Sequence, residues 1–216
     1  MPADAGTAAD AGILPDARIL PAGILLAAGA GSRFGGGKLL HRLPDGESIG
    51  LRAWRNLCAA LEHVTVVVRA GDHDVENLFR EAGAVVTICP DAHLGMGHSL
   101  ACAVRATHEA RGWIIALADM PCVEPATIRR LASQLAAGAD IVVPVHQGQR
   151  GHPVGIAARF GEDLMGLTGD AGARALLRDN AEAIVRIEVA DAGVLQDVDT
   201  REDARRLVTF AERAPR

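Results

Sequence analysis

A short apolar run, Gly23–Leu26, leads directly into the glycine-rich stretch Leu26-Ala27-Ala28-Gly29-Ala30-Gly31-Ser32-Arg33-Phe34-Gly35-Gly36-Gly37-Lys38. Glycine adopts positive φ without strain, so successive backbone N–H groups in such a loop can face one anionic ligand. Arg33 and Lys38 add positive charge to the same loop. The stretch therefore predicts a β-strand followed by a loop that can hold a triphosphate.

Two better-known phosphate-binding loops fit this stretch less well. A Walker P-loop has Ser or Thr after its lysine, whereas Leu39 follows Lys38. The spacing Gly29-x-Gly31-x-x-x-Gly35 resembles a variant dinucleotide fingerprint, which places an acid about 20 residues further on, at the end of the next strand. The next predicted strand is followed by Arg69 instead. A nicotinamide-dependent oxidoreductase and a plain surface loop are therefore kept only as alternatives.

Beyond this loop, β-branched runs alternate with helical patterns. Strands are predicted over Gly23–Leu26, Val64–Val68, Val85–Ile88, Trp113–Leu117, Ile141–Val145 and Ile184–Val189. Helices are predicted over Leu51–Leu61, Asp74–Glu81, Ser99–Ala110, Pro125–Ala136, Ala171–Arg178 and Glu202–Glu212. Pro125 suits a first helical turn, and Thr200 with Asp203 forms a capping-box-like pair.

This alternation predicts an α/β fold, a doubly wound and mostly parallel sheet with helices on both faces. The strand runs are apolar throughout, as expected for strands covered on both faces. In such a Rossmann-like domain, ligands bind at the carboxyl ends of the strands. We expect one domain over residues 19–216, preceded by a flexible Ala/Asp/Gly-rich tail over residues 1–18.

Composition excludes several classes of partner. The net charge of −5 argues against a nucleic-acid surface, which is usually basic. The longest apolar run, Ile19–Ala30, contains Pro21 and Gly23 and is too short to span a bilayer. The tail has no basic segment followed by an apolar one, so it does not read as a signal peptide. The four cysteines form no C-x-x-C pair, and we expect reduced thiols in a cytoplasmic protein.

Acidic residues follow two extended segments. Asp119 comes at the end of the strand Trp113–Leu117, just before Pro121, and is well placed to bind Mg²⁺, which needs few protein carboxylates when phosphate oxygens complete its shell. Asp197 and Asp199 precede the last predicted helix. Their side chains should point to opposite sides, so we expect one of them, Asp199 slightly favoured, to face the metal. Helix capping is the alternative role of Asp199.

Three further loops carry polar groups. Gly95-Met96-Gly97-His98-Ser99 opens a predicted helix, and Ser99 there suits a ribose or a base edge. Arg150-Gly151-His152-Pro153 and Gly169-Asp170-Ala171-Gly172-Ala173-Arg174 each bring a cation and suit a second anionic substrate.

Taken in order, the motifs L-A-A-G-x-x-x-R-x-G-x-x-K, G-M-G-x-S-L, L-A-D-M-P, R-G-H-P-V, G-D-x-G-A-R and D-V-D-T-x-E-D resemble the MobA-like nucleotidyltransferase family. The resemblance extends from Ile24 to Ala204, and within the family it is greatest to the molybdenum cofactor cytidylyltransferases. It implies transfer of CMP from CTP to the terminal phosphate of the molybdenum-pterin cofactor, with release of pyrophosphate. The guanylyltransferase branch resembles L-A-G-G in the first motif, whereas Ala28 here favours CTP.

The resemblance also implies a role for each motif residue. It assigns Leu26, Ala27, Ala28, Gly29, Gly31 and Ser99 to the nucleotide, Arg33 and Lys38 to the triphosphate, Asp119 with Asp197 or Asp199 to Mg²⁺, and Arg150, His152, Asp170 and Arg174 to the acceptor. A client molybdoenzyme would be a transient partner. Arg201, where the family usually has Pro, and the long tail are departures.

The chemistry agrees with this reading. A phosphate monoester is largely a dianion at neutral pH, so its attack needs no general base, only alignment and charge neutralisation. The motifs hold acids, cations and glycines, and His152 is assigned to binding. The alternatives are GTP as donor, a sugar or polyol phosphate as acceptor, a glycosyltransferase, and a non-catalytic nucleotide-binding partner of a molybdoenzyme.

Overall fold

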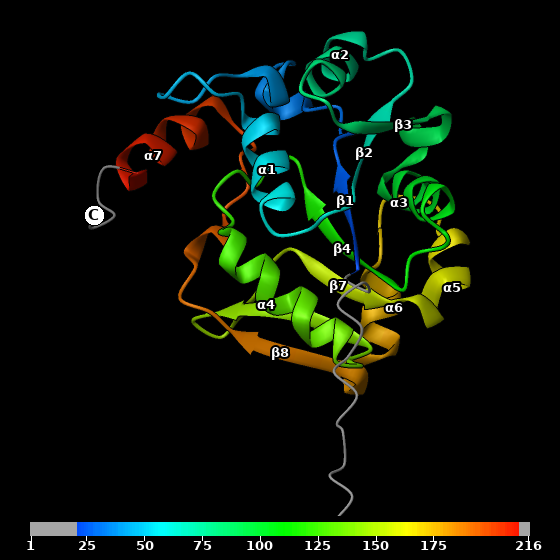
Figure 1. The fold of residues 1–216 in the computed structure, drawn as a ribbon. Helices are drawn as coiled ribbons and strands as arrows, with labels where there is room; N and C mark the ends of the chain where they lie inside the picture. Colours follow the sequence, from blue (N-terminus) through cyan, green and yellow to red (C-terminus); the bar gives the residue numbers. More distant parts are fainter. Residues whose placement is uncertain (1–20, 212–216) are drawn as a thin grey trace, which may run out of the picture.

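The computed structural model describes residues 21–211, so the predicted tail over residues 1–18 and the last residue of the final predicted helix, Glu212, lie outside the described part. Within that part, eight strands form one sheet flanked by helices (Figure 1). The strands are β1 (Ala22–Leu26), β2 (Val64–Arg69), β3 (Val85–Cys89), β4 (Gly112–Leu117), β5 (Ile141–His146), β6 (Gln149–Arg150), β7 (Val154–Ala157) and β8 (Ile184–Glu188).

Helices occupy most of the connections between the strands. The α-helices are α1 (Ile49–Cys58), α2 (His73–Glu81), α3 (Met96–Ala106), α4 (Pro125–Ala136), α5 (Gly161–Met165), α6 (Arg174–Asp179) and α7 (Arg201–Ala211). Short 3-10 turns are η1 (Ser32–Phe34), η2 (Lys38–Leu40), η3 (Pro90–Leu94), η4 (Ala158–Phe160), η5 (Ala181–Ala183) and η6 (Ala192–Leu195). None of the helices described is long and apolar enough to cross a bilayer.

The sheet has the order β3-β2-β1-β4-β7-β5-β6, with β8 paired to β5. Strands β3, β2, β1 and β4 are mutually parallel, as β5 and β8 are, which confirms the predicted α/β fold class. The sheet is nevertheless mixed, because β7 runs antiparallel between β4 and β5, and β6 pairs antiparallel with β5. Neither β6 nor β7 was predicted, since the short segment around the R-G-H-P-V motif was interpreted as a loop.

Alternate residues of the central strands supply two hydrophobic cores. Leu25 of β1 packs on one face with residues of α1, α2, α4 and α7, while Ile24 packs on the other face with residues of α3, α5 and α6. Both side chains are fully buried, and each such burial stabilises the fold by about 1.5–3 kcal/mol. Helices therefore cover both faces of the sheet centre (Figure 1), as the continuous apolar runs predicted.

The prediction of two covered faces was wrong for β3 and β8. Val85 of β3 is 66% exposed and Val185 of β8 is 38% exposed. Both strands lie at margins of the sheet, where each pairs with a single described neighbour, so less of their surface is covered.

Capping residues, proline and glycine near the helix ends explain several helix boundaries. Helix α4 has the predicted bounds, with Pro125 in its first turn. The capping box at α7 is also confirmed: the Thr200 N–H donates to Asp203 Oδ2 at 2.7 Å, and the Asp203 N–H donates to Thr200 Oγ1 at 3.2 Å. Helix α3 begins three residues earlier than predicted, directly after Gly95, and α6 begins at Arg174 because Gly172 precedes it with φ +53°.

Candidate active site

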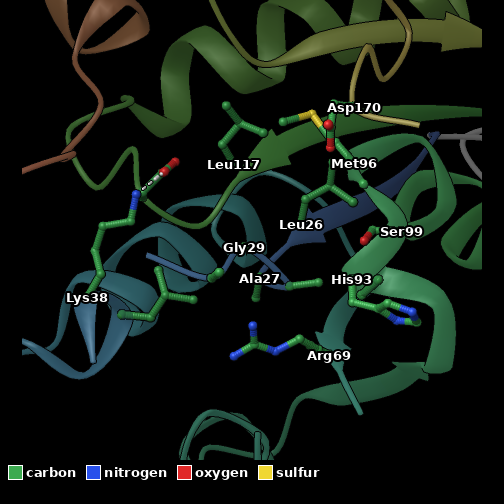
Figure 2. Close-up of a pocket in the computed structure, with 16 residues that line it drawn as sticks. Leu26, Ala27, Gly29, Lys38, Arg69, His93, Met96, Ser99, Leu117 and Asp170 are labelled. Carbon is green, nitrogen blue, oxygen red and sulfur yellow. Dashed lines mark hydrogen bonds and ion pairs between the residues drawn. The ribbon is translucent and has the colours of Figure 1, made fainter. Parts of the chain in front are cut away.

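A cavity of about 430 Å³ opens at the carboxyl ends of β1, β2 and β4 (Figure 2), the edge at which an α/β sheet binds ligands. It is lined by Leu26, Ala27, Ala28, Gly29, Ala30, Lys38, Leu39, Arg69, Ala92, His93, Gly95, Met96, Ser99, Leu117, Asp119 and Asp170. The structure thus brings the predicted nucleotide residues Leu26–Gly29 and Ser99 together with Lys38 and Asp119. Gly31 and Arg33 belong to the same loop but lie outside the lining.

The glycine-rich loop folds back on itself so that its lysine returns to the sheet edge. The Ala27 N–H still donates to Val67 of the neighbouring strand at 2.9 Å, and the chain then leaves the sheet. Gly37 has φ +63° directly before Lys38, a left-handed conformation that other residues adopt only with strain. This reversal of the chain places the Lys38 ammonium near the end of β4 and next to Asp119, which comes shortly after that strand.

Lys38 joins the two acidic segments that the sequence singled out. Its Nζ donates to Asp119 Oδ2 at 2.7 Å and to Asp199 Oδ1 at 3.3 Å. Only 11% of the lysine side chain is exposed. Burial lowers the pKa of Lys38, but the hydrogen bonds and charges of Asp119 and Asp199 outweigh it and raise that pKa above 10.5. Arg33, which is mostly exposed, donates to Asp199 Oδ2 at 2.8 Å.

Asp197 lies in the same field of negative charge. Burial is the main reason that its pKa is raised above 3.8, and the charges of Asp199 and Asp119 add to the effect, while its own backbone N–H and Lys38 oppose it. Asp199 makes the direct ion pairs, whereas the described residues provide no ion pair for Asp197. Asp119 and Asp199 are therefore close enough to act on Asp197, although the two carboxylates from the D-V-D motif differ in their contacts.

These residues fit a hard divalent ion that also takes ligands from a nucleotide. In the described part of the chain, no three His, Cys, Asp or Glu side chains could hold a metal ion alone. However, Asp119 and Asp199 already bracket one cation, the Lys38 ammonium, and both offer only oxygen donors. Mg²⁺ and Mn²⁺ prefer such donors, and Mg²⁺ commonly completes its shell with phosphate oxygens and water.

The acceptor-side residues from the sequence analysis fall into two groups. Burial lowers the pKa of His152 below 6.5. The charges of Arg150 and Arg174 lower that pKa further, and the charge of Asp119 opposes them. The Nδ1 atom of His152 is buried without a hydrogen-bond partner among the described residues. The charges of Arg150, Arg174 and Asp119 thus all act on His152, whereas Asp170 lines the cavity itself beside Met96 (Figure 2).

Two motifs that were interpreted separately form one wall of the cavity. The Gly97 N–H donates to the Gly169 carbonyl at 2.8 Å, and the Gly169 N–H donates to His98 Nδ1 at 3.3 Å. A Cβ at Gly95 would lie 2.4 Å from the Gly169 carbonyl atoms. The loop before α3 and the loop before α6 are therefore in direct backbone contact.

Three residues near the site were missed by the sequence analysis. Asn56 of α1 donates through Nδ2 to the carbonyls of Pro121 and Val123, both at 3.0 Å, and so holds the segment after Asp119. Arg69 and His93 line the cavity. Arg69 could have been found, because it ends the strand after the glycine-rich loop and the parallel topology brings both strand ends to one edge. Asn56 gave no local signal.

The chain matches the MobA-like NTP transferase domain family over residues 23–184. It is 32% identical over 172 residues to the purine catabolism protein PucB of Bacillus subtilis (strain 168), covering 73% of this chain and 82% of that protein. It is 30% identical over 131 residues to the nicotine blue oxidoreductase of Paenarthrobacter nicotinovorans, covering 57% of this chain and 64% of that protein.

Among solved structures, Rv0371c from Mycobacterium tuberculosis H37Rv superposes with a TM-score of 0.78 at 28% identity, covering 88% of this chain and 98% of that chain. The same protein has also been solved as a complex with manganese, with a TM-score of 0.73 at 26% identity. Together with the family match over most of its length, these likenesses show that the chain belongs to the MobA-like NTP transferase domain family and is a nucleotidyltransferase.

Proposed function

We propose that the protein transfers CMP from CTP to the terminal phosphate of the molybdenum-pterin cofactor and releases pyrophosphate. The observation that carries this proposal is that Asp119 takes part in both the cavity and the group of residues proposed to bind the acceptor. Lys38 and Asp119 line the cavity, and the charge of Asp119 also acts on His152, as the charges of Arg150 and Arg174 do. A donor triphosphate and an acceptor phosphate would therefore meet at Asp119.

On the donor side, the chain supplies positive charge and backbone N–H groups. Lys38 and Arg33 would pair with the triphosphate, and Leu26–Gly29 with Ser99 would enclose the nucleoside. Asp119 and Asp199, with Asp197 beside them, would hold Mg²⁺. The ion, when bound, would neutralise the charge that develops on the phosphates during transfer.

On the acceptor side, Arg150 and Arg174 would hold and orient the attacking phosphate. That phosphate is largely a dianion at neutral pH, so no residue has to remove a proton from it. The lowered pKa of His152 keeps its imidazole neutral at that pH, which suits hydrogen bonding to the acceptor better than charge neutralisation. Alignment and electrostatics would then supply most of the catalysis. The product would pass to a client molybdoenzyme, and we place the reaction in the cytoplasm.

A second candidate function comes from the relative that is named nicotine blue oxidoreductase. Its 30% identity shows that this family's sequences also occur in a protein named as an oxidoreductase. An assay of NADH and NADPH oxidation, with an added redox dye as electron acceptor, therefore accompanies the test below.

The test measures pyrophosphate release with Mg²⁺ and each of CTP, GTP, ATP and UTP, with and without the molybdenum-pterin cofactor. CTP-selective release that requires the cofactor is expected. Asp119→Asn should abolish it and remain folded, while Asp163→Asn, at an exposed position of α5, should be fully active. A preference for GTP would assign the guanylyl reaction, and release with a sugar or polyol phosphate would change the acceptor. Oxidation of NADPH coupled to reduction of the added redox dye would favour the oxidoreductase.

A further inference from the structure

Arg69 brings positive charge to a part of the cavity remote from the lysine in sequence. It is the last residue of β2, which pairs in parallel with β1, so its side chain emerges at the same sheet edge as the glycine-rich loop. Figure 2 shows Arg69 and Lys38 in different parts of the cavity, with Gly29 and Ala27 between them. The cavity therefore has a second cationic region, which the proposed triphosphate contacts do not use.

The guanidinium of Arg69 is anchored through one nitrogen. Its Nη2 donates to Asp72 Oδ2 at 3.4 Å, and Asp72 in turn caps α2 by accepting the Val75 N–H at 3.5 Å. Within the described part of the chain, Asp72 is the only polar partner of the Arg69 guanidinium. A guanidinium has five N–H donors and no acceptor, so the remaining donors can serve a ligand that offers adjacent acceptors.

The placement of the triphosphate decides which part of a nucleotide would reach Arg69. If Lys38 and Asp119 mark the phosphate end, the nucleoside extends toward Ser99, His93 and Arg69, between walls that include Leu26 and Ala92. These walls are apolar and suit the face of a base, whereas Arg69 suits its edge. Cytosine presents O2 and N3 as adjacent acceptors, whereas uracil presents an N–H at position 3.

We propose that Arg69 selects the donor nucleotide by donating to the adjacent acceptors of a cytosine base. The proposal rests on the proposed function only in that the cavity must hold a nucleoside triphosphate. A donor-only group rejects uracil because its N3–H would face a guanidinium N–H, and it rejects adenine because the amino group beside N1 would do the same. Guanine remains a competitor, since its O6 and N7 are also adjacent acceptors.

A merely structural role would look different. If Arg69 served only to tie the end of β2 to the cap of α2, its removal would lower stability and weaken all four nucleotides equally. Base selection instead predicts a change in the ratio of affinities. Arg80 provides a matched control, because it also pairs with a carboxylate, Glu76 at 2.8 Å, on α2 but does not line the cavity.

The experiment measures equilibrium binding of CTP, UTP, GTP and ATP with Mg²⁺, without acceptor, to the wild type and to Arg69→Met, Arg69→Lys and Arg80→Met. Melting temperatures are measured alongside to verify folding. Arg69→Met should weaken CTP about 5- to 150-fold, the equivalent of one bidentate base contact, and bring its affinity close to that for UTP. Arg69→Lys keeps the positive charge but loses the pair of parallel N–H donors, so it should also lose the preference for CTP over UTP. Arg80→Met should bind as the wild type does.

The outcomes separate this proposal from the proposed function. Unchanged selectivity in Arg69→Met, or an equal loss for all four nucleotides, overturns base selection by Arg69 while cytidylyl transfer stands. CTP binding that depends on Arg69 without transfer to the molybdenum-pterin cofactor supports base selection and overturns the proposed acceptor. A wild type that binds none of the four nucleotides overturns both.

Discussion

Lys38 donates a 2.7 Å hydrogen bond to the carboxylate of Asp119, which lies 81 residues further along the chain. The same ammonium reaches Asp199 at 3.3 Å, so one cation is shared between the two carboxylates that we propose for the metal. A metal ion and the ammonium cannot both occupy the space between these oxygens. We infer that Lys38 exchanges the carboxylates for phosphate oxygens when the nucleotide and its metal bind.

Replacing Lys38 should therefore have opposite effects on metal and nucleotide. Lys38→Met frees Asp119 and leaves Asp199 paired only with the exposed Arg33, so Mn²⁺ should bind more tightly without nucleotide. The KM for CTP should rise by about tenfold or more, because a charge-assisted phosphate contact is lost. Mn²⁺ titration by electron paramagnetic resonance and steady-state kinetics measure the two effects. Weaker Mn²⁺ binding in the variant would contradict the exchange.

A direct readout of this exchange is available because Lys38 is the only lysine in the sequence. Protein labelled with carbon-13 at the lysine Cε should give one side-chain signal, free of overlap from other lysines. That signal should shift when Mg²⁺ and CTP are added together.

Asp197 should destabilise the metal-free protein. Because its folded pKa is raised above the unfolded value of 3.8, the penalty is absent below pH 3.8 and grows as pH rises through the folded pKa. Asp197→Asn should therefore raise the melting temperature at neutral pH in EDTA, and the gain should shrink toward pH 3.8. Added Mn²⁺ should stabilise the wild type more than the variant. Equal stabilisation of both proteins by Mn²⁺ would remove Asp197 from the proposed metal site.

Asn56 should control the position of Asp119. Asn56→Ala leaves the carbonyls of Pro121 and Val123 without their side-chain donor, which costs about 1–3 kcal/mol of stability when such groups stay buried. We expect a lower kcat with a nearly unchanged KM for CTP, because the loop moves but the base contacts remain. Urea unfolding and steady-state kinetics test both parts.

The matched control for Asn56 is Asn180→Ala. Asn180 donates to the Leu176 carbonyl at 2.9 Å at the end of α6, outside the cavity. This variant should lose stability without losing kcat. A similar loss of kcat in both variants would show that Asn56 acts through general stability alone.

The contrast between Lys38 and Asn56 explains what the sequence could predict. The strand before Lys38, the strand before Asp119 and the capping box at Thr200 rest on signals within a few residues, and each was found. Lys38 and Asp119 were also expected near one ligand, because parallel strands end at one edge of the sheet. Asn56 sits within a helix, and its partners are backbone carbonyls 65 and 67 residues away, so no local pattern identifies it. The antiparallel insertion of β7 is equally non-local, and its four residues include a glycine.

Two glycines in the site should separate binding from folding. A Cβ added at Gly29 would meet no atom within 4 Å, so Gly29→Ala should fold with near-normal stability yet place a methyl group in the cavity. Its KM for CTP should rise.

A Cβ at Gly97 would lie 2.6 Å from the Thr168 carbonyl oxygen, so Gly97→Ala must push apart the two loops that form the cavity wall. It should lose melting temperature as well as activity, because overpacking a tight contact costs typically about 1–3 kcal/mol. Melting curves and CTP binding on the two variants provide the comparison, and a Gly29→Ala protein that binds CTP like the wild type would place the nucleotide away from the glycine-rich loop.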